Sequence, residues 1–252
     1  MAQYVRGTHF LLDEDMKLTL VKAESRGHAN LGWLNSHHSF SFGSYYDPSR
    51  TQFGTLLVLN DDTVVAGRGF GLHPHDNMEI ISIPLDGALE HEDSMGHTQQ
   101  LRVGDVQVMS AGTGLQHKEH NASSENPVSF LQIWITPRQR NTEPRYDQKN
   151  FEASLRADRV QLLVSPEGEE ESLSIGQDAW ISRVDLSSGS SVDYSVRRPE
   201  NGLYIFCLEG GFEIADAVVG QRDALAVNDA TQLALSSAAG AEVLILDVPM
   251  TG

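Results

Sequence analysis

The chain is poor in cysteine and in basic residues, and each shortage excludes a class of protein. One cysteine, Cys207, occurs in 252 residues, so neither an internal disulfide nor a cysteine metal cluster can form. Cys207 lies in an apolar run, and we expect it to be a buried hydrophobic residue. The 18 basic side chains against 35 acidic ones give a formal net charge of -17. Because such a field repels polyanions and no basic run interrupts it, we expect no direct nucleic-acid binding.

Long apolar runs and several well-known catalytic loops are also missing. No stretch approaches the ~18 apolar residues of a membrane helix, and the chain does not begin with a charged-then-apolar signal segment. We therefore expect a cytoplasmic protein without membrane contact. No serine hydrolase elbow is present, and the glycines of residues 67–71 lack the strand–helix context of a nucleotide-binding loop.

What the chain does contain is a series of short β-strand patterns. Apolar or alternating runs are separated by turn residues, which favours a sandwich or barrel. We expect strands at residues 54–60, 79–85, 106–110, 130–136, 204–208 and 242–248. One weak helical turn is predicted at 150–158, and the acidic segment 165–172 is predicted to be a solvated loop.

The two halves of the chain share a pattern. Residues 79–93 and 202–216 align on Gly87 and Gly210, and each reads as an apolar strand, an acidic-glycine turn and a second strand. This repetition predicts a duplicated β unit joined through the polar segment 138–150. All 10 histidines lie at or before position 120, and Val196 and Arg198 stand where His73 and His75 stand in the first half. Only the first unit can therefore hold a histidine-ligated metal.

Two motifs in the first half have the spacing of metal ligands. His73-Pro74-His75 and His117-Lys118-Glu119 each place two potential ligands two residues apart, on the same face of a strand. On facing strands they could close on one divalent ion with three imidazoles and a carboxylate. That set leaves coordination positions open, as catalytic metals require, and suits Fe, Mn, Co, Ni, Cu or Zn. Pro74 predicts that its pair lies at the beginning of a strand, near a barrel mouth.

Other polar residues compete for places in this site. Glu79 could replace Glu119 as the carboxylate ligand or orient a ligating imidazole. His91 is expected to be a surface or hydrogen-bonded residue, with support of a ligand as the alternative. The remaining histidines are expected in an exposed turn (His97), on the opposite face of the strand (His120), or in structural roles around Trp33 (His28, His37 and His38).

Three segments carry a resemblance to a known family. They are RGHANLGWLNSHHSFSFGSYYDP (26–48), GFGLHPHDNMEIISIPLDGALEHEDSMGH (69–97) and GDVQVMSAGTGLQHKEHN (104–121). The chain resembles the pirin family of bicupins, in particular bacterial members with quercetinase activity. The resemblance covers nearly the whole chain, and it is strongest over residues 27–137 and weak after about residue 150.

The resemblance implies an all-β fold of two tandem, jelly-roll-like cupin barrels. Residues 1–137 would form the metal-binding barrel, and residues 138–252 would form a barrel without a metal site. The family's ligands carry over to His73, His75, His117 and Glu119, which favours Glu119 over Glu79. The implied metal is Fe(II) first, with Mn, Co, Ni, Cu or Zn as alternatives.

The implied activity is a dioxygenase that opens the heterocyclic ring of flavonols such as quercetin with O2 and releases carbon monoxide. Glu119 would be the catalytic residue that takes the substrate's proton, as a ligand or as a detached base. We expect a monomer whose pocket includes Phe53, Leu72, Met78 and Phe130. The alternatives are a metal- or redox-sensing regulatory protein without turnover, and a cupin enzyme acting on another small enolisable substrate.

Overall fold

The computed structural model describes residues 16–251, and β-structure dominates this part of the chain. It contains no α-helix there, only the short 3-10 turns η1 (Ala23–Ser25), η2 (Ala153–Arg156) and η3 (Glu169–Glu171). The all-β prediction is confirmed. No helix among the described residues has the length and apolarity needed to cross a membrane. The predicted lack of a signal segment concerns the start of the chain, which lies outside the described residues.

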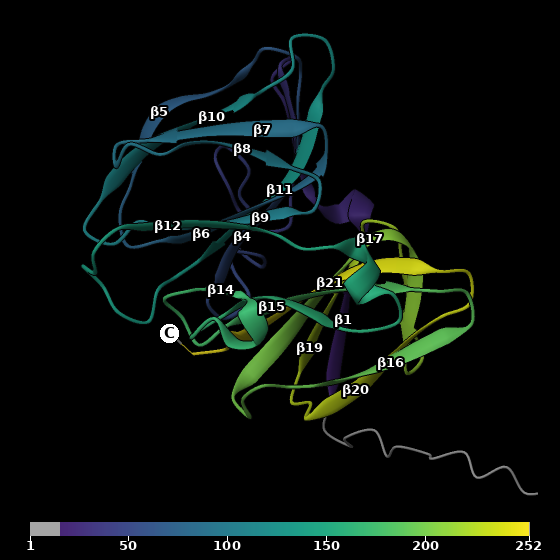
Figure 1. The fold of residues 1–252 in the computed structure, drawn as a ribbon. Helices are drawn as coiled ribbons and strands as arrows, with labels where there is room; N and C mark the ends of the chain where they lie inside the picture. The colour runs from purple at the N-terminus through teal and green to yellow at the C-terminus, as the bar shows by residue number, and fades with distance from the viewer. Residues whose placement is uncertain (1–15, 252) are drawn as a thin grey trace, which may run out of the picture.

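The first barrel consists of a seven-stranded and a four-stranded sheet (Figure 1). The larger sheet contains, in spatial order, β12 (Arg145–Asn150), β9 (Asp105–Ser110), β6 (Glu79–Asp86), β11 (Val128–Ile135), β4 (Leu56–Val64), β3 (Leu34–His38) and β2 (Gly27–Asn30). The smaller sheet contains β5 (Gly69–His75), β10 (Leu115–Asn121), β7 (Ala88–Asp93) and β8 (Thr98–Arg102).

The second barrel is built from a ten-stranded sheet. Its main path is β1 (Lys17–Val21), β19 (Ala224–Asn228), β17 (Asn201–Ile214), β21 (Ala241–Pro249), β15 (Trp180–Leu186), β13 (Gln161–Ser165) and β14 (Leu173–Ser174). The strands off this path are β16 (Ser190–Ser195), β18 (Ala217–Gly220) and β20 (Gln232–Ser237). Each of the six runs predicted to be strands overlaps one of these elements, and the predicted helical turn contains η2.

The two glycines of the repeated pattern occupy equivalent corners. Gly87 separates β6, in the seven-stranded sheet, from β7, in the four-stranded sheet. At Gly210, β17 passes from pairing with β21 to pairing with β18. Both glycines have positive φ, +74° and +73°, and an added Cβ would meet a backbone carbonyl oxygen at 2.9 Å and 2.1 Å. Glycine is therefore favoured at both corners, where the chain exchanges one set of strand partners for another.

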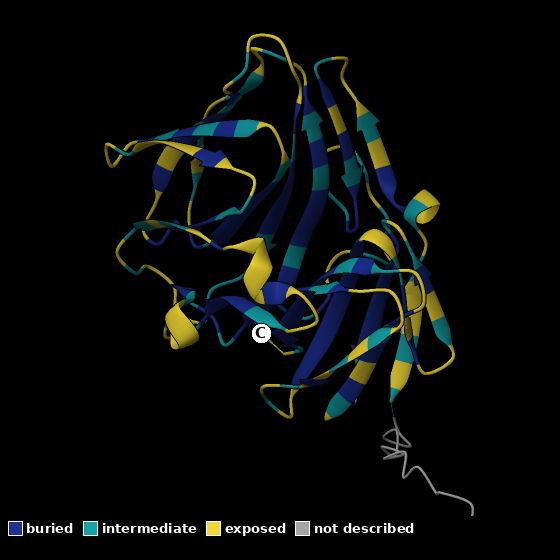
Figure 2. Cartoon of the chain, turned by 45° about the vertical axis from the view of Figure 1, so that its right-hand side comes forward, coloured by how far each residue is buried: buried dark blue, intermediate teal, exposed yellow. Residues whose placement is uncertain are grey.

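A shared hydrophobic core joins the two barrels. Along β17, Leu203, Ile205 and Cys207 point into the second barrel. The alternate residues Tyr204 and Phe206 join the core that also contains side chains from β4, β6 and β11 of the first barrel. This alternation follows the two-residue period of a strand that is buried on both faces. Figure 2 shows the buried strands gathered in the middle of the molecule, and Cys207 is buried as predicted.

Sheet membership crosses residue 137 in both directions. β1, from the start of the described chain, pairs with β19 of the second barrel. β12, which follows residue 137, pairs with β9 of the first barrel. The division into residues 1–137 and 138–252 stays a prediction, and these two exchanged strands tie the units together.

Candidate metal centre

Three of the predicted ligands meet on neighbouring strands. β5 and β10 pair antiparallel, with His73 directly opposite His117. The ring centroids of His73 and His117 are 4.4 Å apart, and that of His75 lies 4.9 Å from each. The two motifs therefore lie on strands that face each other as neighbours in one sheet. The pair at His73 and His75 ends β5 instead of beginning it. β5 is an edge strand, which is where a ladder tolerates Pro74.

The imidazole nitrogens in this cluster are arranged as lone-pair donors. His73 Nδ1 donates to the Gly71 carbonyl at 2.7 Å, so in the neutral ring Nε2 is the nitrogen that carries the lone pair. The Nε2 atoms of His75 and His117 are buried without a hydrogen-bond partner. Burial lowers the pKa of His75 to about 4 and, together with its histidine neighbours, the pKa of His117 to about 2. One nitrogen of each of the three rings lies within 4.8 Å of the others, so the cluster fits a divalent transition metal.

Glu119 lies beside this cluster and belongs to a second, overlapping one. A register shift in the β5–β10 ladder separates His117 from Glu119. On the other side of β10, Glu119 is the strand partner of His91 on β7. His91, His117 and Glu119 form a second group whose ligand atoms lie within 4.8 Å of one another. The Glu119 carboxylate accepts hydrogen bonds from Ser82 Oγ at 3.1 Å and Gln132 Nε2 at 2.7 Å. Its complete burial raises its pKa to about 7.

Glu79, the alternative carboxylate, lies away from both clusters. Its side chain accepts a hydrogen bond from Ser110 Oγ at 2.6 Å and approaches Gly176 of the second barrel. Position 79 alternates with Ile80 and Ser82, so it points out of the first barrel when those residues point in. The geometry therefore favours Glu119 over Glu79, while the full ligand set remains a prediction.

A pocket of about 500 Å³ opens at this cluster, and both His73 and Glu119 line it. Aromatic side chains form much of its apolar wall: Trp33, Phe42, Phe70 and Trp134. Phe42 packs edge-on against Trp134 with ring centroids 5.4 Å apart. Flat apolar walls that converge on a few polar groups are typical of a site for a small aromatic molecule.

The four residues predicted to form the pocket do not line it. Phe53 belongs to the core between the barrels, and Phe130 is fully buried in a core inside the first barrel. Leu72 is 64% exposed, and Met78 packs against a small cluster around Ile80. The prediction was wrong because Leu72 alternates with His73 along its strand, and because apolar character alone did not separate core residues from pocket residues.

A polar wall that was not predicted also lines the pocket, and it consists of Ser36, His38, Asn60 and Asp62. Ser36 donates a short hydrogen bond to Asp62, and His38 Nδ1 donates to Asn60 Oδ1 at 2.9 Å. Burial raises the pKa of Asp62 to about 7. Ser36 and His38 are two residues apart in the sequence, and so are Asn60 and Asp62. This is the same spacing as in the two predicted ligand motifs. The spacing alone could have indicated this wall, although the position of His38 near Trp33 predicted a structural role for it.

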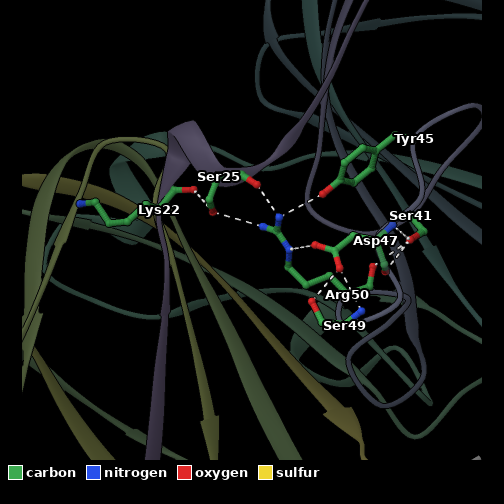
Figure 3. Close-up of polar contacts among 7 residues, drawn as sticks. All are labelled: Lys22, Ser25, Ser41, Tyr45, Asp47, Ser49 and Arg50. Carbon is green, nitrogen blue, oxygen red and sulfur yellow. Dashed lines mark hydrogen bonds and ion pairs between the residues drawn. The ribbon is translucent and has the colours of Figure 1, made fainter.

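Arg50 holds the loop between β3 and β4, whose Phe42 lines the pocket. Figure 3 shows the contacts of Arg50. Arg50 donates to Asp47 Oδ2 and to the Tyr45 hydroxyl, each at 3.0 Å, and to the Ser25 hydroxyl at 3.1 Å. Its remaining contact is with the Ser25 carbonyl oxygen. These bonds attach the middle of the loop to η1, and so they hold one wall of the pocket in place.

Two barrels with a histidine cluster and an aromatic pocket in the first define a bicupin with a candidate metal centre. The model described as Pirin matches residues 20–135, and that described as quercetinase C-terminal cupin domain matches residues 162–248. The quercetin 2,3-dioxygenase of Escherichia coli K12 is 40% identical over 230 residues, which cover 91% of this chain and 98% of that protein. The chain belongs to the pirin family, as its sequence predicted.

Solved structures agree with this assignment. The crystal structure of YhhW from Escherichia coli matches with a TM-score of 0.89 at 40% identity, covering 92% of this chain and 98% of that one. A structure of the bacterial pirin YhhW in complex with nickel(II) matches with a TM-score of 0.88 at 39% identity, covering 92% and 99%. The similarity therefore extends over both barrels.

Proposed function

We propose that the protein is a metal-dependent dioxygenase that opens the heterocyclic ring of flavonols such as quercetin with O2 and releases carbon monoxide. The observation that carries this proposal is the histidine cluster at the wall of an aromatic pocket. The relative named quercetin 2,3-dioxygenase, 40% identical over nearly its full length, supports the choice of substrate.

His73, His75, His117 and Glu119 would hold the metal. Three neutral imidazoles and one carboxylate suit Fe(II), our first choice, and also Mn, Co, Ni, Cu or Zn. The nickel(II) complex of the related YhhW supports a divalent transition metal as the bound ion. When bound, such an ion would supply Lewis-acid chemistry that lowers the pKa of a substrate hydroxyl.

The chain's own groups would bind the substrate and accept its proton. Trp33 and Phe70 pack edge-to-face at 5.2 Å and offer an apolar wall for a flat ring system. Asn60 and Asp62 would hydrogen-bond hydroxyl groups on the opposite side of the pocket. Glu119, which faces the same pocket, would take the proton from the substrate's hydroxyl.

The second barrel would serve as a metal-free companion, with the division at residue 137. Its interior positions carry apolar side chains, among them Leu203, Ile205 and Val243. Polar residues such as Ser82 and Gln132 occupy the interior of the first barrel instead. The predicted monomeric state and cytoplasmic location belong to this proposal, and sedimentation and cell fractionation would test them.

An oxygen electrode combined with absorbance spectroscopy tests the proposed activity. Protein purified without a histidine tag and loaded with Fe(II) is expected to consume O2 and bleach quercetin in proportion to bound metal. Carbon monoxide should appear in equal amount. His75→Ala should abolish all three signals, whereas His28→Ala, which removes a histidine outside the pocket, should retain them.

Two results would redirect the interpretation. Metal-loaded protein that leaves quercetin untouched would favour a sensing or regulatory role. Oxygen uptake with another enolisable compound, but not with quercetin, would favour a different cupin enzyme. Quercetin loss that is independent of bound metal would contradict the metal-dependent reaction.

A further inference from the structure

A chain of polar contacts leads from His117 away from the pocket. His117 Nδ1 lies 3.5 Å from His91 Nδ1, and His91 Nε2 lies 3.3 Å from Asp93 Oδ2. All three residues are buried. His91 lies on β7, the strand next to β10 on the side opposite β5. The contacts therefore approach His117 from behind the histidine cluster.

The hydrogen bonds around Asp93 fix it as an acceptor. Its Oδ1 accepts from the backbone N–H groups of Met95 at 2.9 Å and His97 at 3.1 Å. Its Oδ2 lies 2.9 Å from His97 Nδ1 as well as close to His91. Both oxygens of Asp93 therefore face hydrogen-bond donors, and its side chain acts as an acceptor towards His91.

The positions of the protons follow from this acceptor. A neutral imidazole carries one N–H, and the contact between the Nδ1 atoms of His91 and His117 requires that one of them donates and the other accepts. His91 must place its proton on Nε2 to donate to Asp93, so its Nδ1 carries a lone pair. That lone pair can only accept, and His117 must then carry its own proton on Nδ1. His117 Nε2 then carries the lone pair, and this atom is buried without a hydrogen-bond partner.

Aromatic packing holds this arrangement in place. The ring of Tyr146, on β12, stacks on His91 with centroids 4.8 Å apart and on His97 at 4.7 Å. This contact comes from an exchanged strand that follows residue 137 in the chain. The ring covers His91 and His97 and limits the rotation of both.

We propose that Asp93 and His91 are positioning residues for the metal centre: they fix the tautomer of His117 so that Nε2 is its ligand atom. This inference rests on the proposed metal centre and is independent of the substrate. Partners behind a ligating histidine typically contribute 10–100-fold to metal affinity. His91 would act through its acceptor nitrogen and not by touching the metal.

Titration calorimetry with Ni(II) on three variants tests the proposal. His91→Phe keeps a ring beneath Tyr146 but removes the acceptor, and it should weaken Ni(II) binding by about 10–100-fold. His91→Asn returns an acceptor near the Nδ1 position and should restore most of the affinity. His28→Phe removes a histidine elsewhere and should bind like the unmodified protein. Circular dichroism of the metal-free variants checks that each one is folded.

A second readout detects the tautomer itself. Nitrogen-15 NMR of the metal-free protein should show His117 as a single Nδ1–H form, and His91→Phe should convert it to a mixture. Unchanged affinity or an unchanged tautomer in His91→Phe would overturn the proposal. So would a His91→Asn variant as weak as His91→Phe, which would point to His91 as a direct ligand with His117 and Glu119. Because no substrate is present, failure of quercetin turnover would leave these results intact.

Discussion

Two buried carboxyl groups, Asp62 and Glu119, lie on the walls of the same pocket. Burial raises the pKa of each to about 7, and the charge of Asp62 contributes to the shift at Glu119. Their hydrogen bonds come from neutral side chains: Asp62 accepts from Ser36, and Glu119 accepts from Ser82 and Gln132. At the scale of single residues, the site thus maintains acidic groups that are costly to ionise.

The unfavourable ionisation of buried Asp62 predicts that the stability of the protein depends on pH. The folded pKa of Asp62, about 7, lies above the ordinary value of 3.8, so the folded state binds this proton more tightly. Protonated Asp62 therefore stabilises the folded state fully below about pH 4, and this contribution to the free energy of unfolding is lost as the pH rises towards 7. Asp62→Asn, which can still accept from Ser36, should therefore stabilise the metal-free protein at pH 8, by on the order of 2–4 kcal/mol.

Thermal melts at pH 5 and pH 8 check this prediction. The gain in Tm of Asp62→Asn over the unmodified protein should be larger at pH 8 than at pH 5. Asp193→Asn, an exposed strand residue, is the matched control and should show no such difference. An equal gain at both pH values would mean that Asp62 pays no ionisation cost in the folded state.

The sequence predicted the grouping of the three histidines better than their surroundings. Alternation along a strand placed His73 beside His75, and the structure groups both with His117. Alternation could not predict the position of the Glu119 side chain relative to the histidines. That position depends on the register shift after His117 and on the hydrogen bonds from β6 and β11, which are features of the tertiary structure. The contact between His117 and His91 depends on the order of strands in the sheet, which local spacing does not encode.

At the scale of elements, the loop between β3 and β4 forms a wall of the pocket through Phe42, Gly43 and Ser44. Arg50 connects this loop to η1. Strands such as β6 and β21 were predictable because alternation and turn residues mark them. The loop was not, since the contacts of Arg50 join residues 25 positions apart in the chain.

Removing this arginine should affect substrate binding more than metal binding. Arg50→Ala frees the loop that carries Phe42, so the KM for quercetin should rise about 3–10-fold, as one misplaced wall contact worth ~1 kcal/mol implies. Steady-state kinetics and Ni(II) titration measure the two effects separately. Arg140→Ala, an exposed arginine, is the control. A comparable loss of metal affinity would show that the loop supports the histidine cluster itself.

At the scale of the whole molecule, the core between the barrels makes them one folding unit. Leu131 of β11 is fully buried there, in the same cluster as Tyr204 and Phe206 of β17. β1 and β12 further link the barrels by crossing between their sheets. The repeated pattern predicted two similar units, but nothing in that pattern showed how the units exchange strands.

This coupling predicts one cooperative unfolding transition. Leu131→Ala should lower the free energy of unfolding by about 2–5 kcal/mol, because it leaves a cavity in the shared core. Urea titrations followed by fluorescence and circular dichroism should give coincident curves. Val218→Ala, at a site that is 64% exposed, should change stability by less than about 0.5 kcal/mol. Two separate transitions, of which Leu131→Ala shifts only one, would show that the barrels unfold independently.

The central claim is that one metal ion is held in the first barrel by His73, His75, His117 and Glu119. Anomalous diffraction from crystals of the protein loaded with Ni(II) tests it most directly. We predict a single strong peak bounded by the three imidazoles, with the Glu119 carboxylate turned towards it, and no peak in His75→Ala. A peak bounded by His91, His117 and Glu119 alone, or a peak in the second barrel, would contradict the account.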